Sequence, residues 1–304
     1  EDGQRAFGRW LAAQLGYDFQ RGRLDSTVHP FEVSFTREDV RITTRYNRNF
    51  LPASLFGTAH ETGHALYEQG VSSAYTRTVF ATDLIGLYAV GGTSFGMHES
   101  QSRLWENHIV RSRDFWRLHF ARLQAQFPAQ LADVDAEGFY RAVTHTEPGL
   151  IRVEADELTY DLHVMLRVEL ECALMDGSLG VADLPGVWNE TIRRDLGVTV
   201  PDDARGVLQD IHWSTGYVGS FPSYTIGNVT AAQLMDSLRR RDAGLDEAIA
   251  RGDYAALAGQ LRDAVWQHGR RFTRDEMLVR STGRTLEAGP YIAYLRDKYA
   301  AAPH

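Results

Sequence analysis

Three long stretches of the chain carry apolar residues at helical spacing, and this periodicity constrains the fold more than any other feature. They read QRAFGRWLAAQLGYDF near the N-terminus, SRLWENHIVRSRDFWRLHFARLQAQF after residue 100 and RVEADELTYDLHVMLRVELECALMDG after residue 150. Apolar side chains that recur every three or four residues form one face of a helix, whereas a half-buried strand alternates apolar and polar residues. Gly and Pro fall mainly between these stretches. We therefore expect a mainly α-helical protein.

Shorter helical patterns and glycine breaks complete the predicted architecture. Gly252 and the region of Gly283 separate periodic segments, and we expect further helices at 181–196, 230–250, 253–268 and 287–300. No repeat or low-complexity linker interrupts the chain. We therefore predict a single compact helical domain over residues 1–304.

One segment departs from the helical pattern. In FEVSFTREDVRITTRY, residues 31–46, β-branched and aromatic residues flank the polar turn Thr36-Arg37-Glu38. Such a run predicts a small β-hairpin. Because an open strand edge accepts an extended peptide, we also expect the edge of the 39–46 strand to border a binding cleft.

Composition excludes several classes of function. The formal net charge of -8 argues against a nucleic-acid partner, since phosphate binding needs a concentrated positive surface. The single cysteine, Cys172, rules out an intrachain disulfide and a cysteine-rich zinc module, which favours a reducing, cytoplasmic location. No apolar run approaches the length of a membrane span, so no membrane role is expected.

The sequence HETGH is the strongest candidate for chemistry. On a helix at about 53–69, His60 and His64 lie four residues apart and face the same side, so both imidazoles can bind one ion. Glu61 points in a neighbouring direction, from which a carboxylate can take a proton from a water activated by zinc. The competing interpretation is an ordinary polar helix face.

A catalytic zinc site of this type needs a third protein ligand, and three residues compete for that place. Glu68 lies on the same helix, but three ligands in line would span about 12 Å and could not converge on one ion. His98 and Glu99 lie at the start of a second predicted helix, at about 94–126. A crossing helix can deliver either side chain, so geometry favours these two and does not separate them.

The order of several motifs resembles the carboxypeptidase Taq family of metallocarboxypeptidases. HETGH is followed by HESQSRLWEN, and the flanking elements are HPF at 29–31, DVRIT at 39–43, IRVEAD at 151–156 and GVLQDIHW at 206–213. The resemblance implies that Glu99 is the third metal ligand. It also implies that the protein releases single C-terminal residues from peptides. Zinc is the expected metal, although two imidazoles and a carboxylate also accept cobalt.

The resemblance assigns substrate recognition to an arginine. A carboxypeptidase must bind a free α-carboxylate, and a guanidinium can do so with two parallel hydrogen bonds. Arg152, in the IRVEAD element, is the leading candidate, and we expect a helical stretch to hold it. A surface ion pair with Glu154 or Asp156 is the alternative. Arg41 is the second candidate for the clamp, although its place in DVRIT also suits a strand that supports the site.

Three further residues receive roles on the same basis. His212 and Tyr224 are candidate donors to the carbonyl oxygen that becomes negative in the transition state. Asp156 is a candidate for orienting a ligand histidine through its second nitrogen. Where family members often carry a tyrosine, this chain has Ser220, so any role of that tyrosine would be lost.

Two departures from the family shape the remaining expectations. The segment 71–93 between His64 and Glu99 is longer than the family leads us to expect, and we predict a lid or rim loop there. Family members also carry a long helical region before the part matched here, so we expect a more open site. An open site favours a metallo-endopeptidase or oligopeptidase as the alternative enzyme, and a non-catalytic metal-binding relative as the alternative outside enzymes. A homodimer follows from the family.

Overall fold

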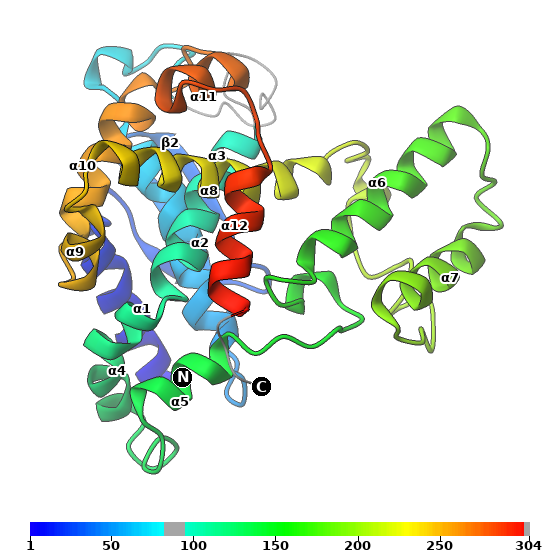
Figure 1. Ribbon diagram of the computed structural model, residues 1–304, viewed down its shortest axis with the longest axis horizontal. Helices are drawn as coiled ribbons and strands as arrows, with labels where there is room; N and C mark the ends of the chain where they lie inside the picture. The colour runs from blue at the N-terminus through cyan, green and yellow to red at the C-terminus, as the bar shows by residue number, and fades with distance from the viewer. Residues whose placement is uncertain (82–94, 301–304) are drawn as a thin grey trace. The chain divides into compact units, whose positions relative to one another are not determined.

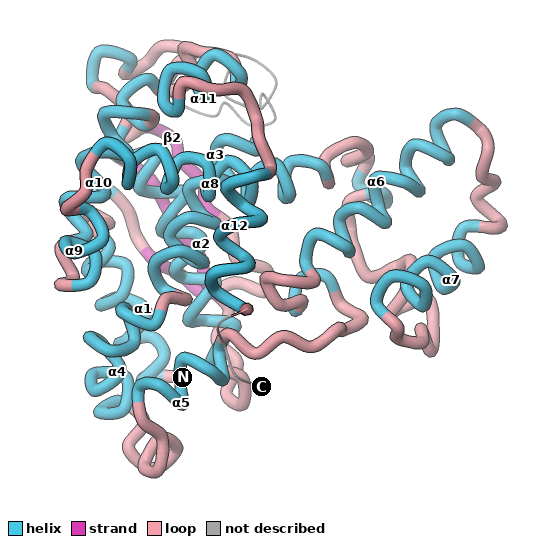
Figure 2. The backbone as a smooth tube through the Cα atoms, viewed as in Figure 1, coloured by secondary structure: helices cyan, strands magenta, loops and turns pink. Residues whose placement is uncertain are grey.

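The computed structural model describes residues 1–81 and 95–300, and it confirms a mainly helical protein with one small sheet (Figures 1 and 2). The chain divides into two compact units, and the single catalytic domain over 1–304 stays a prediction. Unit 1 comprises residues 1–143 and 227–304, and unit 2 comprises residues 144–226. Within the described residues, no helix is both long enough and apolar enough to cross a bilayer.

Unit 1 contains most of the helices. In chain order they are α1 (Asp2–Leu15), α2 (Leu51–Gly70), α3 (Phe95–Arg103), the π-helix η3 (Leu104–Val110), α4 (Arg113–Gln126), α5 (Ala136–Val143), α8 (Pro222–Arg241, in this unit from Gly227), α9 (Leu245–Ala250), α10 (Tyr254–Ala264), α11 (Arg274–Thr282) and α12 (Gly289–Tyr299). Short 3-10 turns lie at η1 (Phe19–Arg21), η2 (Ser73–Tyr75) and η6 (Trp266–His268). The predicted breaks are confirmed, since Gly252 and Gly283 adopt φ angles of 82° and 79° that favour glycine.

Helix α2 lies at the centre of unit 1 and is buried on all its faces. Its apolar residues join the main core with side chains from α1, α3, η3, α4 and α10, among them Leu11, Met97, Trp105, Trp116 and Leu257. A helix that is buried all round must find partners for its polar side chains inside the protein. The polar side chains of α2 must therefore form their hydrogen bonds and ion pairs with residues of the surrounding elements.

The small sheet confirms the predicted hairpin and corrects its use. Strands β2 (Glu32–Thr36) and β3 (Asp39–Thr44) pair antiparallel, and β1 (Leu24–Ser26) adds to β3 in parallel, which gives the order β1-β3-β2. Because β3 is the central strand, both of its edges already carry hydrogen bonds. The prediction that the edge of the 39–46 strand receives a peptide is therefore wrong.

Unit 2 is built on two helices that pack together, α6 (Tyr160–Asp176) and α7 (Leu184–Leu196), with the 3-10 turns η4 (Arg152–Glu154) and η5 (Trp213–Thr215). The third periodic stretch was expected to be helical from residue 152, but α6 begins only at Tyr160. The carboxylate of Asp156 accepts hydrogen bonds from the backbone nitrogens of Leu158 and Thr159, which satisfies donors that precede the helix. Arg152 therefore lies outside α6, in η4.

Candidate metal centre

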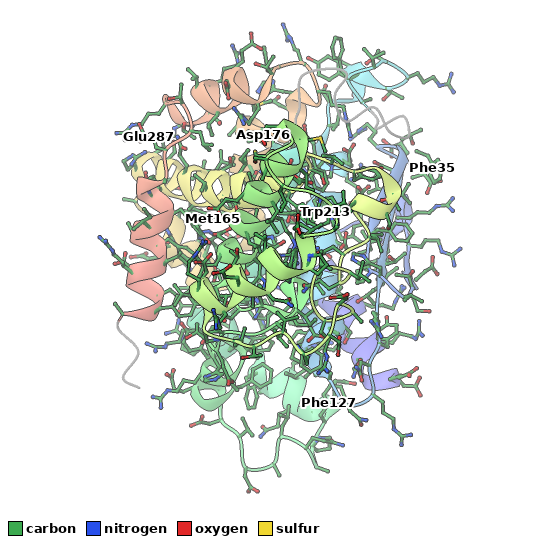
Figure 3. The ribbon with its side chains drawn as sticks, turned by 90° about the vertical axis from the view of Figure 1, so that its right-hand side faces the viewer. Phe35, Phe127, Met165, Asp176, Trp213 and Glu287 are labelled. Atoms are coloured by element: carbon green, nitrogen blue, oxygen red, sulfur yellow. The ribbon has the colours of Figure 1, made fainter. Side chains whose placement is uncertain are left out.

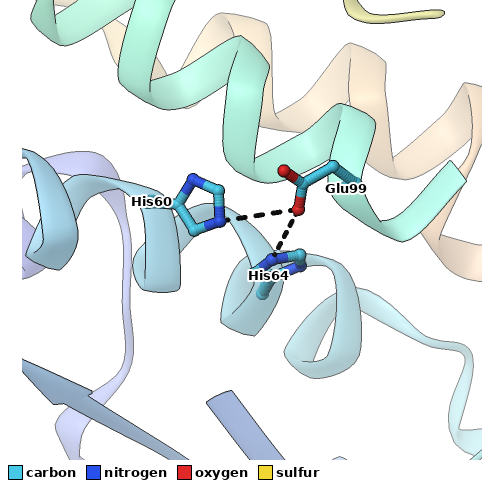
Figure 4. A group of neighbouring side chains, drawn as sticks. All are labelled: His60, His64 and Glu99. Carbon is cyan, nitrogen blue, oxygen red and sulfur yellow. Dashed lines mark ion pairs between the residues drawn. The ribbon is translucent and has the colours of Figure 1, made fainter. Parts of the chain in front are cut away.

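The crossing of α2 and α3 brings His60, His64 and Glu99 together (Figure 4). The two histidines extend from α2 and the glutamate extends from α3, as Figure 4 shows. Glu99 Oε2 lies 3.5 Å from His60 Nε2 and 3.2 Å from His64 Nε2. One potential ligand atom from each of the three residues lies within 4.8 Å of the other two. The second helix thus delivers the third candidate ligand, as the sequence predicts.

These spacings fit a divalent metal ion. In a tetrahedral zinc site with bonds of about 2.0 to 2.1 Å, neighbouring ligand atoms are about 3.3 Å apart. The two distances to Glu99 lie close to that value, and three protein ligands leave a fourth position for water or substrate. Two imidazoles and a carboxylate are also the donor set of catalytic zinc and cobalt sites. The residues present therefore fit a catalytic divalent cation.

The protonation of the two histidines agrees with this interpretation. Burial lowers the pKa of His64 to about 3, so its imidazole is neutral, which is the form that binds a metal. At His60 burial acts in the same direction, but Glu99 and Glu106 outweigh it and raise the pKa well above its ordinary value. A cation held by the group would take the place of that proton.

Glu99 is held rigidly from three sides. Arg103 Nε donates to Glu99 Oε1 at 2.8 Å, and Ser102 Oγ donates to Oε2 at 3.1 Å. On the third side lies Gly227 of α8, where an added Cβ would come within 2.5 Å of Glu99 Cγ. Burial raises the pKa of Glu99, but His60 and Arg103 outweigh it and hold the pKa well below its usual range. Glu99 is therefore an ionised carboxylate whose position is fixed by its hydrogen bonds.

Glu61 differs from its neighbours because no cationic side chain dominates its environment. It is buried on α2 and does not belong to the ligand group. Burial raises its pKa to about 7, with His60 acting to lower it and Glu99 acting to raise it. A carboxylate with a pKa near neutrality is suited to accept a proton in one step and return it in the next.

Glu106 is a site residue that the sequence analysis missed. Its Oε2 lies 3.0 Å from His60 Nδ1, the nitrogen that faces away from Glu99, and its Oε1 accepts from Arg111 Nη2 at 3.2 Å. Burial raises the pKa of Glu106, but the bond to His60 and the charge of Arg111 lower it to about 2. Glu106 lies in η3, directly after α3, and from there its side chain contacts His60. The HESQSRLWEN element already contained this residue.

The carboxylate of Asp156 has other partners within unit 2. It accepts from Glu147 N at 3.1 Å and from Thr159 Oγ1 at 2.8 Å, besides the two backbone donors before α6. In unit 1, the nitrogens of His60 and His64 that face away from Glu99 bond to Glu106 and His98. The orienting role predicted for Asp156 is therefore filled at His60 by Glu106.

The other two candidates for the third ligand, His98 and Glu68, contact each other. His98 Nδ1 lies 2.6 Å from His64 Nδ1, and His98 Nε2 lies 2.8 Å from Glu68 Oε1. Neither belongs to the ligand group with His60 and His64. Burial raises the pKa of Glu68, but Arg270 and His98 outweigh it and bring the pKa to about 2. Glu68 is thus a buried carboxylate.

The helix crossing depends on the glycine inside HETGH. At Gly63 an added Cβ would lie 2.5 Å from the carbonyl oxygen of Gln101 and 2.6 Å from the Cα of Ser102, both backbone atoms of α3. No side chain of α2 can occupy this position unless the backbone of α3 moves away. The close approach also sets the position of Glu99, which lies two residues before Gln101.

We predict that Gly63→Ala destabilises the protein by about 1 to 3 kcal/mol, as overpacking of a buried site does, and weakens metal binding. The matched control is Gly259→Ala in α10, where an added Cβ meets no atom within 4 Å. There alanine should stabilise by about 0.5 to 1 kcal/mol through helix propensity. Urea unfolding and metal titration of both variants check this, and equal effects of the two substitutions would contradict it.

Unit 2 gathers the other predicted residues around Asp210 of the GVLQDIHW element. Arg152 Nε and Nη2 donate to Asp210 Oδ1 at 3.0 and 2.6 Å, and Arg167 Nε donates to Oδ2 at 2.6 Å. Arg152 Nη1 donates to Tyr160 Oη at 2.9 Å. Both arginines are buried. Arg152 is therefore one member of a buried ion triad, not of the surface pair with Glu154 or Asp156 that was the alternative.

His212 and Tyr224 lie beside this triad. His212 Nε2 lies 2.9 Å from Tyr224 Oη, and the His212 ring stacks on Phe221 with centroids 4.3 Å apart. The Arg152 guanidinium lies 5.0 Å from the centre of the Tyr224 ring. The next residue, Trp213, labelled in Figure 3, donates from Nε1 to Glu171 at 2.8 Å. Arg152, His212 and Tyr224 thus form one polar cluster in unit 2.

We predict that Asp210→Asn destabilises unit 2 by about 3 to 5 kcal/mol, because it leaves the buried charges of Arg152 and Arg167 without their counter-ion. Asp39→Asn, which removes an exposed partner of Arg41, should cost less than about 1 kcal/mol. Tryptophan fluorescence during urea unfolding measures both. Equal stability of the two variants would contradict the buried-triad assignment.

The same substitution has a predicted pH dependence. Burial raises the pKa of Asp210, but Arg152 and Arg167 outweigh it and lower the pKa below its ordinary value. A lowered pKa contributes stability above the unfolded pKa of about 3.9, and that contribution is lost as the pH falls through the folded value. The gap between the native protein and Asp210→Asn should therefore be full at pH 6 and should shrink in acid.

Arg41 lies on β3 and is largely exposed. Its Nε and Nη2 donate to the two carboxylate oxygens of Asp39, each at 2.8 Å. Exposed pairs of this kind contribute little stability. The predicted loop at 71–93 falls partly on residues 82–94, which lie outside the described residues; before them, the chain forms η2.

Comparison with known proteins identifies the family. The family model described as carboxypeptidase Taq (M32) metallopeptidase matches residues 1–299. Thermostable carboxypeptidase 1 of Thermus thermophilus is 45% identical over 99% of this chain and 57% of its own length. Carboxypeptidase 1 of Bacillus subtilis is 40% identical over 98% of this chain and 58% of its own length.

A solved structure agrees with these sequence matches. The crystal structure of the M32 carboxypeptidase from Deinococcus radiodurans R1 superposes with a TM-score of 0.93 at 47% identity, covering 99% of this chain and 59% of that one. The chain therefore spans somewhat more than half the length of the relatives that it matches. From the shared motifs, the fold and these matches, the chain belongs to the M32, or carboxypeptidase Taq, family of metallopeptidases.

Proposed function

We propose that the protein is a zinc-dependent carboxypeptidase that hydrolyses the C-terminal peptide bond of peptides. The observation that carries the proposal is the convergence of His60, His64 and Glu99, with Glu61 buried on the same helix as the two histidines. Membership of a family whose characterised relatives are named carboxypeptidases supports the choice of reaction. The donor set also accepts cobalt, so either ion could support activity.

The residues of α2 and α3 divide the work of hydrolysis. A divalent cation held by His60, His64 and Glu99 would polarise the scissile carbonyl and lower the pKa of a water molecule. Glu61 accepts the proton that the attacking water loses, and it returns that proton to the departing amine. Because Glu61 is buried on α2 directly beside His60, one carboxylate can serve both transfers.

Recognition of the substrate carboxylate is assigned to Arg152, with Arg41 as the second candidate. Arg152 keeps N–H groups beyond those bonded to Asp210 and Tyr160, since a guanidinium has five donors. Asp210 and Tyr160 hold its plane fixed. His212 and Tyr224, which are bonded to each other, are the proposed donors to the transition-state oxygen. The imidazole of His212 and the hydroxyl of Tyr224 would then act together.

The test compares N-blocked dipeptides that carry a free C-terminal acid with the same dipeptides amidated. A carboxypeptidase should cleave the free acid at least about 100-fold faster than the amide. The amide lacks the negative charge that the arginine binds, and this loss costs about 3 kcal/mol of charge-assisted binding. Equal rates would support a metallo-endopeptidase or oligopeptidase. Stoichiometric metal without turnover of either peptide would support a non-catalytic metal-binding relative.

Two substitutions separate the arginines. If Arg152 is the clamp, Arg152→Lys keeps the charge but loses the fork, so KM for the free acid should rise, whereas Arg41→Gln should leave KM unchanged. The reverse result would assign the clamp to Arg41.

The single cysteine, Cys172, is consistent with a cytoplasmic location. A homodimer is expected from the family, and light scattering measures the oligomeric state.

A further inference from the structure

We propose that His98, Glu68 and Arg270 form a positioning chain behind the ligand His64, which fixes the tautomer and ring orientation of that ligand. The inference rests on the proposed metal site and extends it to three residues that do not contact the ion. All of them belong to unit 1, and all are buried. A positioning chain is distinct from a structural ion pair because its loss should change the metal, not only the fold.

The first link follows from the chemistry of imidazole. His64 directs Nε2 toward Glu99 and Nδ1 toward His98 Nδ1, at 2.6 Å. A neutral imidazole that binds a metal through the lone pair of Nε2 carries its hydrogen on Nδ1. Two ring nitrogens can form a hydrogen bond only when one donates and the other accepts. His64 therefore donates, and His98 Nδ1 accepts.

The second link follows from the first. Because His98 accepts through Nδ1, its own hydrogen lies on Nε2, and this atom faces Glu68 Oε1 at 2.8 Å. The carboxylate of Glu68 is gripped in turn by Arg270, whose Nη2 and Nη1 lie 2.6 and 3.3 Å from Oε1 and Oε2. Each group in the chain has a single orientation that satisfies its neighbours. Arg270 favours an ionised Glu68, and the bond from His98 Nε2 to that carboxylate agrees with a hydrogen on His64 Nδ1.

Packing holds the interposed ring in place. The ring planes of His64 and His98 lie 27° apart with centroids 4.7 Å apart, and Tyr67 meets the His98 ring edge-on at 4.9 Å. Tyr67 also donates from its hydroxyl to the carbonyl of Gly269 at 2.7 Å, which ties α2 to the residue before Arg270. The chain therefore connects the metal helix to a segment about 200 positions later in the sequence.

The two ligand histidines are consequently supported in different ways. His60 bonds directly to the carboxylate of Glu106, which is the common arrangement for a metal-binding histidine. His64 reaches its carboxylate, Glu68, only through His98. Because His98 and Glu99 are adjacent, α3 supplies both the third ligand and the partner that orients the second. A displacement of α3 would disturb both at once.

The test measures metal binding by His98→Phe, which keeps an aromatic ring, slightly larger than imidazole, and removes both nitrogens. Competition between protein and a chromophoric chelator for Zn²⁺ should show an affinity about 10- to 100-fold weaker than that of the native protein. With Co²⁺, the visible absorption bands should change, because the orientation of a ligand imidazole alters the coordination geometry. In turnover, kcat should fall more than KM rises.

The matched control is His108→Phe. His108 is as buried as His98 and stacks on Tyr294 with centroids 3.8 Å apart, so its substitution tests the cost of losing a buried histidine in the same unit. Its Zn²⁺ affinity and Co²⁺ spectrum should match those of the native protein. A His98→Phe variant that is folded and binds Zn²⁺ with native affinity would overturn the proposal.

Two milder variants keep the test decisive if His98→Phe does not fold. His98→Asn retains an oxygen near the Nδ1 position, so it should bind Zn²⁺ more tightly than His98→Phe but more weakly than the native protein. Glu68→Gln removes the negative charge between His98 and Arg270, and the Zn²⁺ affinity of this variant should also fall. Native affinity in either variant would overturn the chain. If the native protein itself binds no Zn²⁺, the proposed function fails instead, so the two failures are distinguishable.

Discussion

Glu61→Gln is expected to lower kcat toward an N-blocked dipeptide with a free C-terminus by about 10²- to 10⁴-fold, the usual contribution of a general base. Gln has the same shape as Glu but cannot accept the proton that the attacking water must lose. Because Glu61 lies outside the group of His60, His64 and Glu99, the variant should still bind one metal ion per chain. Steady-state kinetics and elemental analysis on one preparation measure both effects.

The control for this substitution is Glu137→Gln. Glu137 lies on α5 and pairs with Arg113 and Arg141 at the surface, so its loss should change kcat by less than about twofold. Undiminished turnover by Glu61→Gln would defeat the proposed mechanism. A loss of turnover together with the metal would instead assign Glu61 to the binding of the ion.

Glu99→Gln is expected to weaken Zn²⁺ binding by more than about 100-fold, which exceeds the 10- to 100-fold loss typical of residues that only support a ligand. The substitution removes the negative charge of the proposed third ligand and leaves Arg103 beside two imidazoles. Activity should fall in parallel. Chelator competition gives the affinity, and added Zn²⁺ should restore part of the activity.

Glu106→Gln is the matched comparison, because Glu106 is a buried glutamate of the same segment that contacts His60 from the other side. Its affinity loss should stay within the 10- to 100-fold range. If Glu106→Gln lost more affinity than Glu99→Gln, the third ligand would be misassigned. Native affinity in Glu99→Gln would lead to the same conclusion.

The parts of the site that could be predicted from the sequence are those set by local geometry. The four-residue spacing of His60 and His64 places both rings on one face of α2 whatever surrounds the helix. The hairpin at β2 and β3 likewise follows from alternation and a polar turn. The choice of Glu99 needed the family resemblance, since rise and periodicity alone left His98 open.

The parts that could not be predicted depend on contacts between distant segments. Arg270 reaches Glu68 across 202 positions, and Asp210 reaches Arg152 across 58, and no local pattern indicates either pair. Strand β1 escaped prediction because a three-residue strand is too short to show alternation, and its parallel partner makes β3 central. The error about the edge of β3 came from this missing strand.

The burial of α2 explains why the structure gives Glu68 and His98 a different place from the one that the sequence offered them. The sequence offered Glu68 and His98 as alternatives for the third metal ligand. In the structure they contact each other and form a chain of hydrogen bonds behind His64. A buried polar side chain in the interior of α2 must have a partner. That rule, applied to a helix known to be buried all round, would have pointed to such a chain. The sequence alone did not indicate that α2 is buried on every face.

The most direct test of the central claim removes and restores the metal. Dialysis against a strong chelator should reduce the metal content from one ion per chain to near zero and should abolish cleavage of the blocked free-acid dipeptide. One equivalent of Zn²⁺ or Co²⁺ should restore both together, and Glu99→Gln should fail to recover at the same concentration. Full peptidase activity in the metal-free protein would contradict the assignment of His60, His64 and Glu99 as a catalytic metal centre.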